Sequence, residues 1–291
     1  MNALFINCSL FFICFSIILS LTSNNILMFW LLLELSSFFL VFVFLNDKED
    51  GNVQFASFIF YLFSGISSIL VVSGAFFVSE FLLLSGLLIK FFLFPFLMVL
   101  FYIFNNVSWF LIFVIGSLFK GFIFCLTYFF YFNNILLNNI NIFICLLSWF
   151  VLGYYLLNVT LNLKGLWFII NLNSSITLYL SCFLLSNSEI FYLFFVYITL
   201  SVINIYLLYF LSVSFSNNVN NLQLDTSIFF LISLVGFPVS LNIIYKIISG
   251  FFLYFFCSWL LLLFWLCYVI AETLYLFFFF SSYLEKVSLY Y

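Results

Sequence analysis

Long apolar stretches run through this chain, separated by short clusters of Asn, Ser, Gly and charged residues. A helix needs about 20 mainly apolar residues to cross a bilayer. About ten segments of that kind are predicted, at residues 3–21, 26–45, 54–78, 81–104, 108–132, 140–158, 165–185, 190–212, 226–250 and 252–282. The alternating pattern of barrel strands is absent. Because every backbone group in lipid needs a partner inside the protein, the pattern predicts an all-α, polytopic transmembrane helical bundle.

Composition predicts a single integral membrane domain over residues 1–291. Of these residues 68% are hydrophobic and 5% are charged, whereas a soluble domain carries about 25% charged residues. The chain therefore cannot cover a water-facing surface. Its net charge of −3 offers no basic footprint for nucleic acid. Its lysines are too few and too evenly spread to predict which way the chain is oriented in the membrane.

Neither the cysteines nor the N-terminus indicates a cofactor or an import signal. The seven cysteines form no CxxC pair, and the chain has no histidine, so haem, iron–sulfur and zinc sites are not expected. The N-terminus lacks a basic region, a cleavage site and an Arg-rich amphipathic presequence. The favoured residues, led by Phe, Leu, Ile, Asn and Tyr, have T- and A-rich codons, which suggests a mitochondrial genome.

Five charged residues interrupt the apolar segments, whereas the other charges lie at segment ends or in loops. The five are Glu34, Lys90, Lys120, Lys246 and Glu272. Each ionised residue at the centre of a membrane costs about 2.5–3.5 kcal/mol, so such residues are by default functional. Lys90 and Lys120 lie too far from their segment ends to reach the headgroups by snorkelling. For Lys246 and Glu272 the segment boundaries leave snorkelling open.

The only two prolines each accompany one of these lysines. Pro95 follows Lys90 by five residues, and Pro238 precedes Lys246 by eight. Proline frees the carbonyl four residues earlier, which for Pro95 belongs to Phe91. At membrane depth such a carbonyl must be satisfied by side chains or water. We therefore predict two discontinuous helices with polar pockets beside the lysines; an ordinary packing kink is the alternative.

A buried lysine beside a movable carboxylate can exchange protons without a cofactor. Desolvation favours a neutral amine, and a nearby opposite charge favours the ammonium. At 4 Å and an effective dielectric of about 20 the attraction is about 4 kcal/mol. Movement of Glu34 relative to Lys90 would therefore switch the lysine between holding and releasing a proton. With no histidine, the onward hydroxyl candidates are Ser85, Ser117, Thr127, Ser233, Ser240 and Tyr245.

The order and spacing of these residues over roughly residues 20–250 resemble the family of subunit two of mitochondrial NADH:ubiquinone oxidoreductase, respiratory complex I. The similar stretches are NILMFWLLLELSSF (25–38), GLLIKFFLFPF (86–96), IGSLFKGFIF (115–124) and ISLVGFPVSLNIIYK (232–246). Two features depart from the family pattern: no histidine follows Pro95, and Val239 replaces the second proline of the second break. Glu272 has no evident counterpart.

The resemblance implies an antiporter-like fold in the N-terminally shortened form that animal versions have. It implies that Glu34 and Lys90 form a modulating ion pair, that Lys120 is the central proton relay, and that Lys246 is the terminal lysine. The chain would bind no cofactor, because NADH, FMN, iron–sulfur clusters and ubiquinone belong to other subunits. Its partners would be other membrane subunits of complex I, including neighbouring antiporter-like subunits, and membrane lipids, in the mitochondrial inner membrane.

Two other functions remain open from the sequence. The chain could be a stand-alone cation/proton antiporter or another antiporter-like subunit of complex I. It could also be a purely structural membrane subunit whose lysines only bind anionic lipid.

Overall fold

The computed structural model describes residues 3–23, 25–47, 52–125, 135–158, 162–184, 187–216, 241–256 and 259–288. These residues are almost entirely helical, and no strand occurs among them. Five of the described helices are long and apolar enough to cross a membrane, at Ile26–Leu45, Val53–Phe76, Ile140–Leu157, Glu189–Phe210 and Trp259–Phe279. The described part of the chain is therefore a multi-pass, membrane-embedded helical bundle, as the apolar pattern predicts.

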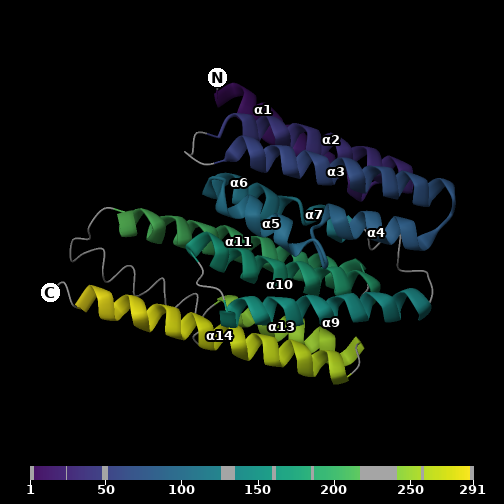
Figure 1. Cartoon of the computed structure of the whole chain (residues 1–291). Helices are drawn as coiled ribbons and strands as arrows, with labels where there is room; N and C mark the ends of the chain where they lie inside the picture. Colours follow the sequence, from purple (N-terminus) through teal and green to yellow (C-terminus); the bar gives the residue numbers. More distant parts are fainter. Residues whose placement is uncertain are drawn as a thin grey trace.

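The first three helices coincide with predicted segments and lie side by side at one edge of the molecule (Figure 1). They are α1 (Ala3–Leu21), α2 (Ile26–Leu45) and α3 (Val53–Phe76). Helix α2 begins after Asn25, whose side chain accepts a hydrogen bond from the backbone of Leu27. This N-cap satisfies one of the backbone donors that the start of a helix leaves without a partner. The polar residue that separates two apolar segments in the sequence therefore begins the helix in the structure.

The fourth predicted segment is broken in two, which confirms the first predicted discontinuity. Helix α4 (Glu80–Lys90) ends at the lysine, and helix α5 (Leu97–Asn105) begins two residues after Pro95. The six residues between the helices are not helical. The second predicted break, at Gly236 and Pro238, lies outside the described residues.

The fifth predicted segment is also irregular, which the sequence did not predict. Its described part, up to residue 125, contains α6 (Trp109–Phe113), the π-helix η1 (Val114–Leu118) and α7 (Gly121–Cys125). A π-helix widens the turn and commonly marks a functional position within a helix. Lys120 lies two residues after the end of this π-helix.

The C-terminal half forms five described helices. They are α9 (Ile135–Asn158), α10 (Leu163–Leu184), α11 (Asn187–Ser216), α13 (Leu241–Phe256) and α14 (Trp259–Ser288). The predicted boundary between residues 250 and 252 is wrong, because α13 continues through Gly250. This glycine permits close packing instead of ending the helix: a Cβ atom there would lie 2.8 Å from Cζ3 of Trp265.

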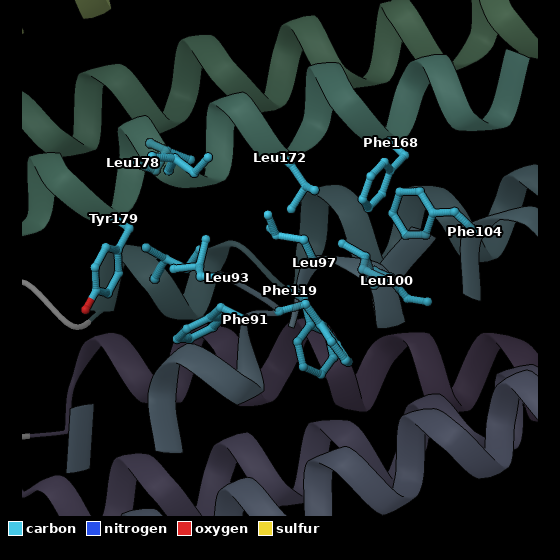
Figure 2. Packing of buried hydrophobic residues seen from close by; sticks show 14 of the residues in the cluster. Phe91, Leu93, Leu97, Leu100, Phe104, Phe119, Phe168, Leu172, Leu178 and Tyr179 are labelled. Carbon is cyan, nitrogen blue, oxygen red and sulfur yellow. The ribbon is translucent and has the colours of Figure 1, made fainter. Parts of the chain in front are cut away.

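Helix α10 is the most enclosed helix and lies between the N-terminal helices and the α9, α13 and α14 group (Figure 1). From residue 165 to residue 182 every side chain is buried except Ile170, which is half-buried. On one side Phe168 and Leu172 pack toward Phe104 and Leu97 of the broken segment (Figure 2). Because α10 is covered by protein instead of lipid, it can carry polar residues that a lipid-facing helix could not.

The close approach of α3 and α4 gives a testable packing constraint. Gly74→Ala should destabilise the protein, because the added Cβ would lie 2.5 Å from the backbone nitrogen of Leu83 and 2.8 Å from its Cα. Backbone atoms cannot rotate away, so the helices would have to separate at a cost of about 1–3 kcal/mol. The thermal unfolding midpoint of the detergent-solubilised chain should fall. Gly65→Ala on the same helix is the matched control, since nothing lies within 4 Å of its added Cβ. Equal destabilisation by both changes would contradict the proposed steric constraint.

Candidate functional site

Lys90 occupies the last residue of α4 because a Schellman motif ends the helix there. The backbone nitrogen of Leu93 donates to the carbonyl of Leu88 at 2.9 Å, and that of Phe92 donates to Ile89 at 3.1 Å. Phe92 takes the left-handed conformation, with φ of 53°, which glycine usually supplies in this motif. The helix thus ends one residue before Phe91, whose carbonyl the proline was predicted to free. Lys90 lies in the last turn, where the negative end of the helix dipole favours a cation.

Glu34 and Lys90 form an ion pair between α2 and the end of α4. The lysine nitrogen lies 2.5 Å from Oε1 of Glu34, and their side chains are 3% and 27% exposed. The same nitrogen reaches the hydroxyl of Ser37 at 3.4 Å, one helical turn beyond Glu34. The structure therefore brings together the two residues that the sequence predicted as a pair, with the carboxylate on the more open side.

Lys120 is buried, and its partners among the described residues are neutral: three oxygens and the ring of Tyr197, whose centre lies 4.2 Å from the lysine nitrogen. Its ammonium donates to the backbone carbonyl of Asn171 at 2.6 Å, to Oγ of Ser174 at 2.7 Å and to the hydroxyl of Tyr197 at 2.8 Å. These three acceptors match the three donors of an ammonium group. The burial that the sequence predicted for Lys120 is confirmed, and snorkelling does not occur.

The π-helix before Lys120 helps to position these three acceptors. The hydroxyl of Tyr197, which accepts from Lys120, donates onward to the carbonyl of Gly116 at 2.9 Å. A Cβ atom on Gly116 would collide with the side-chain amide of Asn171. The wide turn and the glycine therefore let α10 and α11 approach closely enough to supply the ligands of the ammonium.

Lys246 and Glu272 form a second ion pair, between α13 and α14. Lys246 Nζ lies 3.0 Å from Oε1 of Glu272, and their side chains are 13% and 2% exposed. The other carboxylate oxygen accepts from Nδ2 of Asn173 at 3.3 Å. The sequence singled out both residues but did not predict that they contact each other. Snorkelling, which the sequence left open for Glu272, does not occur.

Three separate small cavities lie beside the charged residues in the order Glu34, Lys90, Lys120 and Lys246, which we call the row. The first is lined by Glu34 and Lys90, and the centre of a water molecule could occupy about 10 Å³ of it. The second measures about 20 Å³ and is lined by Lys90 and Lys120. The third measures about 30 Å³ and is lined by Lys246 and Glu272, and also by Ser174 and Tyr197, which both bind Lys120. About 10–15 Å³ suffices for one water, so the second and third cavities can each hold ordered water.

The hydroxyl groups along this row differ from most of those expected. Ser85 and Ser117 donate to carbonyls of their own helices, those of Leu82 and Phe113. Tyr245 does belong to the row, because its hydroxyl lies 2.8 Å from that of Thr177. Thr127, Ser233 and Ser240 lie outside the residues whose side chains the structure describes.

The residues that sequence reasoning missed lie mainly on α10. Within NLNSSIT (171–177) every polar side chain is buried. The signal was present, since five polar residues within seven positions interrupt the middle of an apolar segment. In a chain rich in Asn and Ser that cluster resembles the punctuation at segment ends, which is why it was not singled out.

The described residues contain no group of three or more His, Cys, Asp or Glu side chains that could hold a metal ion. No protein-family model matches the sequence, and no curated protein is similar to it by sequence comparison. The fold and this site together define a class: a multi-pass helical membrane protein whose buried lysines form one polar row.

Loss of a hydroxyl that binds Lys120 should destabilise the protein more than loss of a neighbouring hydroxyl that does not. Ser174→Ala removes one of the three acceptors of a buried ammonium, so we expect a loss of about 1.5–3 kcal/mol in the free energy of unfolding. Ser175→Ala is the matched control, because the Ser175 hydroxyl donates only to the carbonyl of Asn171 at 3.0 Å. Its loss should be about 0.5–1.5 kcal/mol. Denaturant unfolding in micelles measures both values, and a larger loss for Ser175→Ala would contradict the assignment of Ser174 as a ligand.

Proposed function

We propose that this chain is an antiporter-like membrane subunit of respiratory complex I, of the subunit-two type, in the mitochondrial inner membrane. In this role it contributes a proton path that is driven by electron transfer in other subunits. The observation that carries the proposal is the row from Glu34 through Lys90 and Lys120 to Lys246, along which three separate water-sized cavities lie. The resemblance of the four sequence stretches to that family supplies the identity of the complex.

The arrangement supports proton transfer because the lysines do not all hold their charge in the same way. Lys90 has the carboxylate of Glu34, Lys246 has the carboxylate of Glu272, and Lys120 has only neutral partners among the described residues. Separation of Glu34 from Lys90 would weaken the hold on the ammonium proton, which could then pass through the shared cavity toward Lys120. Lysine, hydroxyl and water groups suffice for these steps, so the chain needs no redox group of its own.

One feature supports the antiporter-like architecture within this proposal. The broken helix at Lys90 supplies irregular backbone where a cavity is lined, which is the place where membrane proteins tolerate it. The contacts that we expect with neighbouring antiporter-like subunits follow from the resemblance of the four sequence stretches to the subunit-two family. Transfer of one charge against 100 mV costs about 2.3 kcal/mol, so the path requires coupling to an exergonic reaction elsewhere.

Lys120→Met should abolish most proton translocation while the complex remains assembled. The methionine side chain has a similar length but cannot carry a proton, so we expect at least about a tenfold loss in transfer rate. NADH-driven proton uptake into inner-membrane vesicles, divided by the amount of assembled complex, measures the effect. Lys90→Met should act in the same direction.

Lys164→Met is the matched control for this experiment. Lys164 lies near the start of α10 and donates to the carbonyl of Val107 at 2.7 Å, away from the row, so proton uptake should remain near the wild-type rate. Full activity in both Lys90→Met and Lys120→Met would overturn the proposal in favour of a structural subunit. Cation/proton exchange by the purified chain alone would instead identify a stand-alone antiporter.

A further inference from the structure

Glu272 is a buried carboxylate that the proposed proton path does not yet use. Its side chain is 2% exposed, in the middle of α14, and its Oε1 lies 3.0 Å from Lys246. A buried carboxylate requires compensation by opposite charge or by hydrogen bonds. The chain could have avoided this requirement with an apolar residue, since replacement of a buried pair by apolar groups is often neutral or stabilising. Packing alone therefore does not account for Glu272.

Three helices hold the carboxylate in a fixed orientation. From α9, Nε1 of Trp149 donates to Oδ1 of Asn173 at 3.0 Å. That bond leaves the amide nitrogen of Asn173, on α10, to donate to Oε2 of Glu272 at 3.3 Å. The second oxygen, Oε1, has the ammonium of Lys246 as its ionic partner. The carboxylate is thus oriented by neutral groups on one side and presents its other oxygen to the lysine.

The cavity beside this pair extends to the ligands of Lys120. It is lined by Glu272, Lys246, Thr177 and Tyr245 as well as by Ser174 and Tyr197. Trp167 and Trp265 also line it, and their indole nitrogens have no hydrogen-bond partner among the described residues. A polar cavity of about 30 Å³ is large enough for ordered water. Water there would connect Lys120 to the Lys246–Glu272 pair.

From this geometry we propose that Glu272 is the counter-ion that makes Lys246 the terminal proton-holding residue, so that the path has a gated ion pair at each end. The inference rests on the proposed function. A proton that arrives through the cavity converts the neutral amine of Lys246 to an ammonium, which the carboxylate of Glu272 then holds. Release reverses this step: the proton leaves the ammonium, restoring the amine, as the pair separates. Glu34 and Lys90 form the corresponding pair at the other end.

Glu272→Gln tests the proposal because glutamine keeps the shape and the acceptor for Asn173 but removes the charge. We expect proton uptake per assembled complex to fall at least about tenfold. A structural role would instead lower the amount of complex and leave the number of protons moved per NADH oxidised unchanged. Glu272→Asp, which keeps a carboxylate, should restore part of the rate. Glu80→Gln, at the exposed start of α4, is the control and should pump at the wild-type rate.

The failure of this inference can be told apart from the failure of the proposed function. If Lys120→Met stops pumping and Glu272→Gln pumps normally, only the role of Glu272 is overturned. If Lys120→Met also pumps normally, the proposed path fails and the role of Glu272 fails with it.

A second measurement covers the case in which Glu272→Gln does not assemble. The infrared difference spectrum between resting and NADH-driven wild-type complex should contain a carboxylate band that shifts in Glu272→Asp, because the pair opens during turnover. Identical carboxylate bands in the wild type and Glu272→Asp would overturn the proposal.

Discussion

An ionised side chain inside a membrane bundle persists only where protein atoms replace the water that it has lost. The arrangement of this protein follows from that constraint. Four of the five charges inside apolar segments meet in two ion pairs, and the fifth, Lys120, has three oxygen ligands. These ligands come mainly from α10, which explains why the least apolar of the long helices is also the most enclosed one. A helix rich in Asn and Ser can lie at this depth only because other helices cover it.

The irregular backbone lies where the charges are, and each irregularity has a local function. At Lys90 a Schellman turn ends α4, so the dipole of the helix end stabilises the ammonium. Before Lys120 a π-helix, with Gly116 at its centre, lets Tyr197 bind both the lysine and a backbone carbonyl. Lys246 and Glu272 pair between the regular helices α13 and α14, so in the described part of the chain an irregular backbone accompanies only Lys90 and Lys120. At these two positions regular helical hydrogen bonds are lost, and the lysine ammonium gains favourable surroundings.

Much of the fold could be predicted from the sequence, because hydrophobic length is a local property. The first three helices and the break at Pro95 followed from apolar runs and proline chemistry. The partners of the charges could not be predicted, because contact between Lys246 and Glu272 depends on how α13 and α14 pack. Gly250 illustrates the same limit: a glycine that ends a helix and one that admits a neighbouring Trp265 look alike in sequence. The π-helix left no signal in composition or in periodicity.

The unequal surroundings of the three lysines have a consequence for the proposed path. A carboxylate about 4 Å from an ammonium contributes about 4 kcal/mol at an effective dielectric of 20, and only Lys90 and Lys246 have one. In the proposed path a proton at Lys120 has only neutral partners, so the central position would be the least stable of the three for a charge. A proton would therefore rest at either end and cross the middle only when an end pair opens. Such an arrangement would limit leakage of protons along the row more than a uniform row of lysines would.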